Sequence, residues 1–445
     1  MSALLTDLYQ LTMMQAHLNE GLTDQAVFEL FVRKLPLQRN FLVAAGLEHA
    51  LQFLKSLSFS EAEYAWLRDH GEFSERMLEY VKALRFTGDV DAMPEGTVFF
   101  AGEPILRITA PLPLAQLVGS RLLNIVHFET LIASKAARAV IAAGERRLVD
   151  FGMRRAHGAD AALRAARAAY LVGFDGTATA DAGRRFGVPV FGTVAHSHVQ
   201  AHGSGKAAFL AFAQGQPEGA TVLIDTYDTY DTEAAAAKLI ELSATLGRQG
   251  LKVVAMRLDN GDLHTLATAV RGMLDAANLH DITIFASGNL DELRIAELLR
   301  TGTPLDGFCL GASLDASSDA PLLDAAYELQ RYAGAPRRRR SQGGATWPGV
   351  KQVLRQLDAQ GHIERDLVVL ESEQADGQAL LLPCMRAGRR VGRTPTLNES
   401  RAHHAHQMSM LPPTLRALEP AEAPFSASFS PGVVALAREA GAFDA

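Results

Sequence analysis

The sequence contains few cysteines and no long apolar stretch, and each shortage excludes a class of protein. Two cysteines, Cys309 and Cys384, occur among 445 residues, which argues against a disulfide framework and favours a reducing compartment. No run is long and apolar enough to cross a bilayer. The N-terminus carries an early acid, Asp7, and lacks the basic start and apolar run of a secretory signal. We therefore expect a cytoplasmic protein with no membrane partner.

Positive charge is also in short supply. Acidic residues outnumber basic ones by 50 to 43, and the net charge of −7 gives a fold that is not built to attract nucleic acid. In such a chain the arginine run at 337–340 is typical of a solvated loop, with a nucleic-acid or phosphate patch as the alternative. The hydrophobic share of 48% fits a globular protein with a sizeable core.

Two familiar catalytic patterns are missing. No Gly-x-Gly-x-x-Gly motif opens a helix, which weakens the case for dinucleotide binding. No Ser-His-Asp set accompanies a nucleophile elbow, so acyl transfer is not supported. His403, His404 and His406 resemble a metal cluster, but they have no carboxylates or cysteines at ligand spacing. These patterns leave the chemistry to other parts of the chain.

The middle of the chain repeats one plan, in which an apolar strand ends in polar or glycine-rich residues and a helix follows. Strands that alternate with helices at this spacing predict a parallel sheet. Functional residue types at every strand end favour an irregular, TIM-like α/β barrel over a doubly wound sheet. We expect helices at 233–246 and after Pro321. The expected strands are 148–151, 173–175, 188–191, 221–224, 251–256, 282–285 and 307–310.

The two ends of the chain follow a different pattern. Short strands at 86–90, 98–100 and 105–109 are split by glycine and proline, and they follow helices expected at 4–19 and 41–57. This mixture is typical of an α+β domain. We predict an N-terminal α+β domain over residues 1–125 with part of 345–445 packing on it, an irregular barrel carrying the active site over 126–344, and a C-terminal segment over 345–445.

Cations and glycines gather at the predicted strand ends. Arg154, Arg155 and Arg257 are permanent cations suited to bidentate binding of carboxylate or phosphate. Gly288 and Gly311 leave backbone N–H groups open beside helix N-termini, as in barrels that bind phosphate after their last strands. The sequence therefore predicts an anion site.

A second group of cations lies on the helix expected over residues 114–144. Lys135 and Arg138 are three residues apart and share a helix face. This face is either solvated or forms a basic pair at the mouth of an anion site.

One histidine and several acids complete the strand-end set. His196 follows the strand at 188–191, and an imidazole there can act as a base or accept a phosphoryl group. The set suits an anionic, phosphorylated sugar handled with Mg²⁺, and it leaves an aldolase, an isomerase and a phosphoribosyltransferase open. The acids that can hold Mg²⁺ or sugar hydroxyls are Asp225, Asp228, Asp259 and Asp262.

Eight motifs, in this order, resemble those of the nicotinate phosphoribosyltransferases, and the likeness extends from about residue 4 to about residue 370. The motifs are LTDLYQLTM at 5–13, FELFVRKLP at 28–36, DFGMRRAHG at 150–158, GTVAHS at 192–197, DTYDT at 225–229, RLDNGD at 257–262, SGNLDE at 287–292 and PGVKQV at 348–353.

The resemblance implies a type II phosphoribosyltransferase fold, with a mixed α/β domain from both chain ends and an irregular α/β barrel. It implies an enzyme of NAD salvage that joins nicotinate to phosphoribosyl pyrophosphate, giving nicotinate mononucleotide and pyrophosphate. ATP is implied as a co-substrate hydrolysed through a phosphohistidine, and Mg²⁺ is implied as a cofactor. A homodimer is implied, with each active site at the subunit boundary.

The same resemblance assigns roles by motif. His196 resembles the phosphorylated histidine, and Asp259 resembles the acid that holds the ribose hydroxyls. Mg²⁺ would be held mainly through substrate phosphates. The implied nicotinate contacts are Tyr9 from the partner subunit, Phe151, Arg154, Thr193 and Arg257. The implied contacts of phosphoribosyl pyrophosphate are Lys135, Arg138, Asp259, Gly288, Gly311 and Ser313.

Six positions depart from the family's pattern. The loss of a threonine hydroxyl from the phosphate loop weakens phosphate binding, although Ser313 can supply a hydroxyl. Two alternatives stay open: a related pyridine phosphoribosyltransferase with another substrate preference, and a catalytically weakened regulatory paralogue. The departures are Gly119 for glutamate, Gly205 for an acid, Asn260 for serine, Ala312 for threonine, and Glu328 and Gly344 for lysines.

Overall fold

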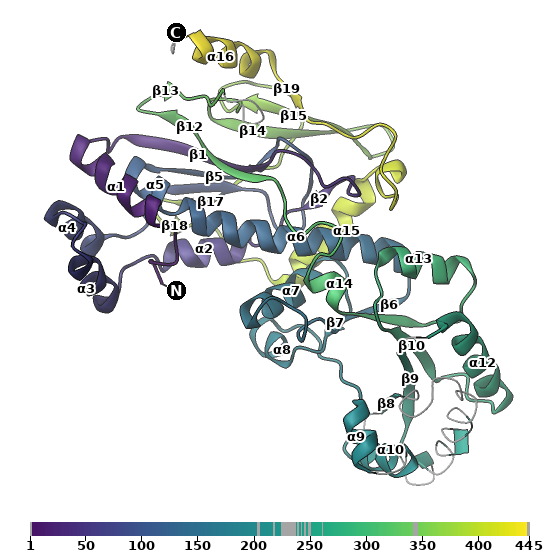
Figure 1. Cartoon of the computed structure of the whole chain (residues 1–445). Coiled ribbons are helices and arrows are strands. Elements are labelled where there is room, and N and C mark those ends of the chain that lie inside the picture. Colours follow the sequence, from purple (N-terminus) through teal and green to yellow (C-terminus); the bar gives the residue numbers. More distant parts are fainter. Residues whose placement is uncertain are drawn as a thin grey trace. The chain divides into compact units, whose positions relative to one another are not determined.

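The computed structural model divides into two compact units, and both ends of the chain belong to the first (Figure 1). The first unit comprises Met1–Ser134 and Leu322–Ala445, and the second comprises Lys135–Pro321. The division predicted from the sequence instead has boundaries at 125/126 and 344/345. The residues described are 2–202, 205–216, 219–223, 251–259, 261–340 and 346–442, with isolated positions between 223 and 251.

The first unit is built on a seven-stranded antiparallel sheet in the order β13-β12-β1-β5-β3-β17-β18. β1 is nearly all apolar and buried, because β12 and β5 pair with it on either side. The strands are β1 (Gln25–Val32), β3 (Asp89–Ala92), β5 (Pro104–Pro111), β12 (Ala325–Tyr332), β13 (Ala335–Pro336), β17 (Leu382–Arg386) and β18 (Arg389–Arg390).

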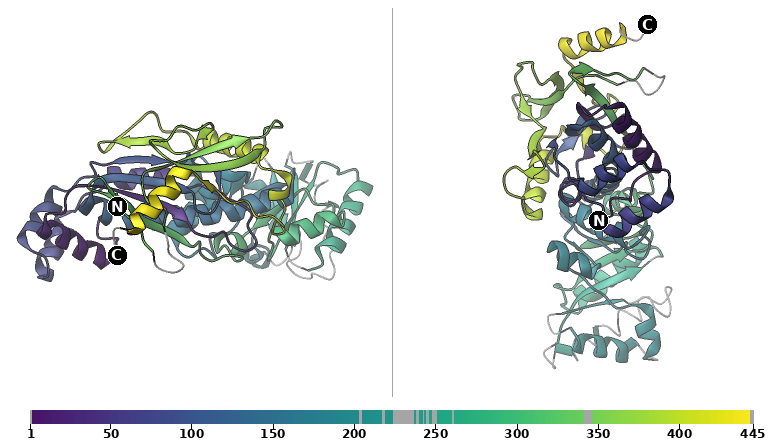
Figure 2. Two further views of the ribbon diagram at one scale, coloured as in Figure 1. Left: turned by 90° about the horizontal axis from the view of Figure 1, so that it is seen from above. Right: turned by 90° about the vertical axis from the view of Figure 1, so that its left-hand side faces the viewer.

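Two smaller sheets complete the first unit. One has the order β16-β14-β15-β19, and the other pairs β2 with β4. Figure 2 shows α16 (Pro431–Ala442) beside the larger of them, where it packs on β15. The strands are β2 (Leu42–Val43), β4 (Val98–Phe99), β14 (Lys351–Leu357), β15 (Ile363–Leu370), β16 (Gln378–Ala379) and β19 (Ser428–Phe429).

Two helices of the first unit begin at capping boxes. Ser60 and Glu63 form a capping box at the start of α3, and Thr396 and Glu399 form another at α15. Besides α16, the bounds of the helices of this unit are α1 (Leu8–Glu20), α2 (Leu47–Lys55), α3 (Glu61–His70), α4 (Glu75–Ala83), α5 (Leu112–Leu117), the first part of α6 (Gly119–Ala143), α15 (Leu397–Met410) and the short 3₁₀ helix η1 (Pro413–Leu415).

Two helices predicted from the sequence are wrong. The helix expected at 41–57 starts only at Leu47, because Gly46 at φ 90° breaks it from the strand β2. The helix expected after Pro321 is the strand β12, whose partner β1 lies almost 300 positions earlier in the chain. The short helix α14 (Ala312–Asp315) precedes it.

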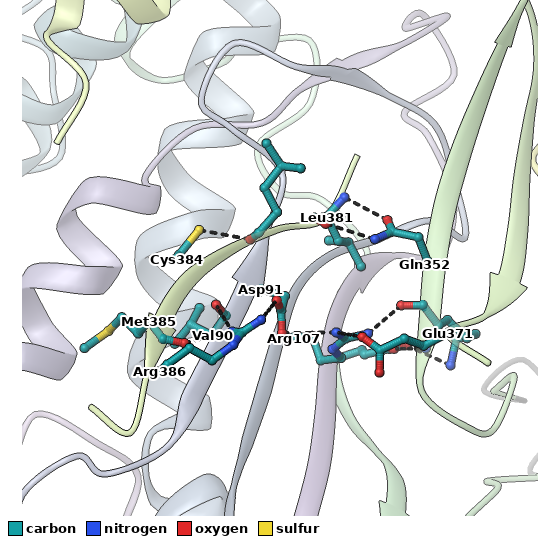
Figure 3. A network of polar contacts seen from close by, with 12 residues as sticks. Val90, Asp91, Arg107, Gln352, Glu371, Leu381, Cys384, Met385 and Arg386 are labelled. Carbon is teal, nitrogen blue, oxygen red and sulfur yellow. Dashed lines mark hydrogen bonds and ion pairs between the residues drawn. The ribbon is translucent and has the colours of Figure 1, made fainter. Parts of the chain in front are cut away.

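Buried charges tie the strands of the first unit together (Figure 3). The guanidinium of Arg107 donates to Asp91 at 3.0 Å and to Glu371 at 2.7 Å, and Arg386 donates to the other oxygen of Asp91 at 2.5 Å. Burial raises the pKa of the nearby Cys384 thiol to about 11, so this cysteine is not a ready nucleophile.

The three histidines that resemble a metal cluster lie on α15. His404 is buried and bonds through Nδ1 to the carbonyl of Gly96 at 3.0 Å, and His403 bonds through Nε2 to Thr97 at 3.0 Å. Within the described ranges no group of three or more His, Cys, Asp or Glu residues is placed to hold a metal ion. Among those residues there is also no helix that is both long and apolar enough to cross a membrane.

The second unit contains a curled, six-stranded parallel sheet in the order β7-β6-β11-β10-β9-β8. Val190 adds a parallel bridge beside Thr177 of β7, and Thr193 donates from Oγ1 to the carbonyl of Thr221 on β8 at 3.1 Å. The strands are β6 (Arg147–Asp150), β7 (Gly176–Thr177), β8 (Ala220–Leu223), β9 (Val253–Asp259), β10 (Thr283–Ser287) and β11 (Gly307–Leu310).

Helices alternate with these strands, as the sequence predicts. The parallel α/β arrangement is confirmed, whereas a complete TIM-like barrel is not seen in the described part of the chain. The helix expected at 233–246 lies mostly outside the described residues. The helices are α7 (Ala159–Val172), α8 (Ala180–Phe186), α9 (His196–Ala201), α10 (Gly205–Gln214), α12 (Leu263–Ala276), α13 (Glu292–Arg300) and α14, together with the end of α6.

Candidate functional site

The parallel sheet brings most of the predicted site residues to one edge. In parallel strands the carboxyl ends face the same way, and open α/β sheets bind ligands there. The register pairs Ser287 with Asp259 and Leu310 with Asp150, so these strand ends lie level. Residues from distant parts of the chain therefore meet at this edge.

Arg257, Asp259 and Ser287 form the polar centre of the edge. The Arg257 guanidinium donates from Nε to Ser287 Oγ at 2.8 Å and from Nη2 to Asp259 Oδ2 at 3.0 Å. Ser287 Oγ lies 2.8 Å from the other oxygen of Asp259. Because Arg257 is only 11% exposed, these bonds fix the direction in which its remaining N–H groups point.

His196 is the first residue of α9 and lies beside this centre. Its Nε2 is 3.8 Å from Asp259 Oδ2, and its side chain is 46% exposed. The imidazole is thus open to a ligand while a carboxylate lies close to it. Asp259 is thus an acid of the described residues that lies close to His196.

Phe151 adds an aromatic wall to the same edge. Its ring centroid lies 5.5 Å from Cζ of Arg257, a cation–π distance. Its backbone N–H donates to the carbonyl of Leu310 at 2.6 Å, so the loop after β6 is tied to β11. Arg154 lies exposed in the following turn. A flat ring bearing an anionic group fits between such a wall and such a cation.

The two glycine loops predicted to bind phosphate are held against each other. Gly288 has φ +88° and lies three residues before Asp291, whose carboxylate caps α13. Ser313 donates its hydroxyl to the carbonyl of Leu290, which links the loop after β11 to the loop after β10. Ala312, which departs from the family's threonine, is exposed. The Ser313 hydroxyl hydrogen is therefore already used in a hydrogen bond within the protein.

Lys135 and Arg138 are buried, so the solvated-face alternative is wrong. Glu292 forms ion pairs with both side chains, at 2.6 Å from Lys135 Nζ to Oε2 and at 2.9 Å from Arg138 Nε to Oε1. Lys135 Nζ also lies 3.1 Å from Asp319 Oδ1. Burial alone would raise the pKa of Glu292, but the two cations hold that pKa below its usual value. Their role as phosphate ligands stays a prediction.

Two of the acids offered as Mg²⁺ or sugar ligands, Asp225 and Asp228, lie outside the described residues, as do Asn260 and Gly344. Asp262 caps α12, accepting the backbone N–H of Thr265 at 3.3 Å. Gly205 begins α10.

Tyr9 lies in the first unit, on the exposed side of α1. Its hydroxyl lies 3.3 Å from Gln10 Nε2 and 3.5 Å from Ser120 Oγ. Its predicted contact with nicotinate across a subunit boundary stays a prediction.

Two departures in the first unit have a physical explanation. A Cβ on Gly119 would lie 2.7 Å from the Tyr327 ring, which stacks on Phe28 at 4.9 Å, so a larger residue needs that ring to move. Glu328 accepts from Arg33 at 2.7 Å and from Arg339 at 3.0 Å. A lysine at 328 would instead place a third cation there.

Sequence reasoning missed several residues of this edge. Ser287 orients Arg257, Glu292 holds the two buried cations, and Asp315 lies behind the loop after β6. Ser287 and Glu292 are both inside the SGNLDE motif, so the signal for them was present. Asp315 has no such signal, because only the fold places it next to Asp150.

Comparisons with known proteins identify relatives of this chain. The sequence matches the model of the nicotinate phosphoribosyltransferase N-terminal domain over residues 4–127 and that of the nicotinate phosphoribosyltransferase family over 146–303. A nicotinate phosphoribosyltransferase of Mycobacterium tuberculosis is 47% identical over 418 residues, which is 94% of this chain and 89% of the relative. One of Bacillus subtilis is 38% identical over 84% of this chain and 78% of its own.

A solved structure also matches. The crystal structure of human nicotinic acid phosphoribosyltransferase superposes with a TM-score of 0.87 at 29% identity, covering 98% of this chain and 100% of that one. The fold and the sequence thus point to the same family.

Proposed function

Because the chain belongs to the nicotinate phosphoribosyltransferase family, we propose that it joins nicotinate to phosphoribosyl pyrophosphate, giving nicotinate mononucleotide and pyrophosphate for NAD salvage. The observation that carries the proposal is the Arg257–Asp259–Ser287 centre between Phe151 and His196. A fixed guanidinium beside an aromatic ring suits a pyridine carboxylate. This pairing selects the acid over the amide.

The described residues account for the transfer step mainly through positioning and electrostatics. When pyrophosphate leaves, positive charge develops on the anomeric carbon of the sugar. The Asp259 carboxylate, held by Arg257 and Ser287, is fixed at the edge where this charge would form and can accept hydrogen bonds from the ribose hydroxyls. The glycine loops after β10 and β11 would orient the 5′-phosphate.

We also propose that ATP hydrolysis is coupled through His196. Its imidazole would accept the γ-phosphoryl group of ATP and release ADP, and water would later cleave the phosphohistidine to give inorganic phosphate. The exposed side chain and the carboxylate 3.8 Å away support this role. Mg²⁺ would be held mainly through substrate phosphates, and it would neutralise the leaving pyrophosphate.

We further propose a cytoplasmic homodimer with shared active sites. Tyr9 supports this proposal, because it is a large aromatic residue that is 54% exposed on its own chain. A partner subunit would give that ring a pyridine to contact.

Product analysis tests the reaction. Purified protein supplied with nicotinate, phosphoribosyl pyrophosphate, ATP and Mg²⁺ is expected to release pyrophosphate and nicotinate mononucleotide in equal amounts. Nicotinamide in place of nicotinate is expected to give much less product. Equal rates with both pyridines would favour the alternative of a changed substrate preference.

Intact mass tests the ATP step separately. After incubation with ATP, wild-type protein is expected to carry one added phosphate, and His196→Ala none.

A second candidate function is that of a regulatory paralogue. The Ser313 hydroxyl, which already donates to Leu290, and the exposed Ala312 favour weak phosphate binding, as in such a paralogue. Nucleotide binding without turnover would support that second candidate and overturn the first.

A further inference from the structure

Two buried carboxyl groups lie behind the loop that carries Phe151. Asp150, at the end of β6, is fully buried and accepts the backbone N–H of Gly152 at 2.7 Å and the hydroxyl of Thr177 at 2.6 Å. Asp315, at the end of α14, is 2% exposed. Within the described part of the chain, neither of its carboxyl oxygens receives a hydrogen bond from an N–H or a neutral hydroxyl donor. Its carboxyl group packs on Gly152, whose backbone N–H bonds to Asp150, so the two buried carboxyl groups meet at this glycine.

The carboxyl group of Asp315 lies directly against the backbone of Gly152. A Cβ built on Gly152 would lie 2.1 Å from Cγ of Asp315, so the carboxyl group packs directly on the glycine. Two ionised carboxylates in such a place would repel each other without solvent to screen them. One proton between them removes the repulsion and satisfies both groups.

We propose that Asp315 is a positioning residue, which stays protonated and donates its proton to Asp150, thereby holding the loop of Phe151 in place. The inference deepens the proposed function and rests on it. Asp150 ends β6 and bonds to Thr177 of β7 and to Gly152 in the loop after β6. Asp315 ends the helix α14, which follows β11. Phe151 follows Asp150 directly, so the proton acts on the pyridine wall through the backbone.

The charges around the pair support a protonated Asp315. Burial and the neighbouring Asp150 raise the pKa of Asp315 to about 9. On α7, which packs against α14, Arg167 is the buried charged residue, whereas Asp160 and Arg164 pair with each other at 3.2 Å. Arg154 and Arg155, in the loop after β6, are exposed. Burial is thus the main reason that the proton stays on Asp315, and Asp150 adds to it.

The stability of the pair depends on pH with a defined sign. Native Asp315 keeps a proton that the unfolded chain loses above its ordinary pKa of 3.8, so raising the pH destabilises the native state until about pH 9. Asp315→Asn keeps a donor toward Asp150 but cannot titrate. Between about pH 5 and pH 8, the unfolding equilibrium constant of wild type is expected to rise about tenfold per pH unit relative to Asp315→Asn.

Infrared difference spectroscopy gives a direct readout. Wild type minus Asp315→Asn is expected to show the C=O band of a protonated carboxylic acid near neutral pH, and this band is expected to disappear on alkaline titration. If no such band appears, or if the two proteins unfold with the same pH dependence, the shared proton is overturned. Neither measurement depends on the enzyme's substrates.

Steady-state kinetics test the effect on function, with KM for nicotinate measured as a function of pH in wild type and in the Asp315 variants. In wild type KM is expected to increase as the pH passes about 9, where Asp315 ionises, whereas in Asp315→Asn it stays level. Asp315→Ala, which lacks a donor, is expected to have a raised KM at every pH. Identical pH profiles in wild type and Asp315→Asn would contradict the positioning role. If no variant makes product while the infrared band is present, the proposed reaction fails and the proton pair stands.

Discussion

In the proposed function, Arg257 is the residue on which the choice of substrate depends. Its guanidinium is already bound on one side by Asp259 and Ser287, which leaves one side for a ligand carboxylate. The sequence predicted this arginine, the acid two residues later and the histidine, because all three follow strands that alternate with helices. It did not predict Asp315, because the role of Asp315 depends on Asp150, which only the folded chain brings near, and it left Ser287 without a role although Ser287 lies inside the SGNLDE motif.

Arg257→Ala is therefore expected to lose a charged hydrogen bond to nicotinate of about 1.5–3 kcal/mol. Steady-state kinetics should show kcat/KM for nicotinate reduced roughly ten- to a hundredfold, with a smaller change for nicotinamide. Arg294→Ala on the surface of α13, where the arginine pairs with Glu297, is the matched control and should match wild type. A proportional loss for both pyridines would show that Arg257 does not read the carboxylate.

At the scale of elements, local patterns predicted five of the seven strands expected in the second unit, whereas the strand expected at 173–175 is displaced to β7 and 188–191 forms only the bridge at Val190. Each strand of the parallel sheet is followed closely by its helix, so periodicity and turn residues are sufficient. β12 is different, since its strand conformation is set by β1 from the other end of the chain. Gly46 explains the other error, because its backbone conformation separates a strand from a helix inside one apolar run.

One buried ion pair is expected to dominate the stability of the first unit. Arg355 on β14 donates to Asp366 on β15 from Nη2 to Oδ2 at 2.6 Å and from Nε to Oδ1 at 2.9 Å. Both side chains are fully buried. Asp366→Ala leaves the guanidinium buried without its carboxylate, at a cost of about 3–5 kcal/mol in the free energy of unfolding. Urea unfolding should show a lower midpoint for this variant.

Asp181→Ala removes a carboxylate of the same kind from the surface pairs of α8 and serves as the control. Its midpoint should stay at the wild-type value. Equal midpoints for both variants would mean that the buried pair contributes little.

For the whole molecule, the account depends on a partner subunit to complete each site. Tyr9→Ala and His196→Ala homodimers should each be nearly inactive. If the site is shared, a mixture refolded together should recover about a quarter of wild-type activity, because half of the dimers then contain one intact site. Activity that stays at background, in a mixture shown to exchange subunits, would mean that Tyr9 acts within its own chain.

The most direct measurement is a crystal structure of the protein with nicotinate mononucleotide. The account predicts the pyridine carboxylate within hydrogen-bond distance of Arg257, the ring against Phe151, and the phosphate at the loops that follow β10 and β11. A nucleotide bound away from the carboxyl ends of the parallel strands would contradict it.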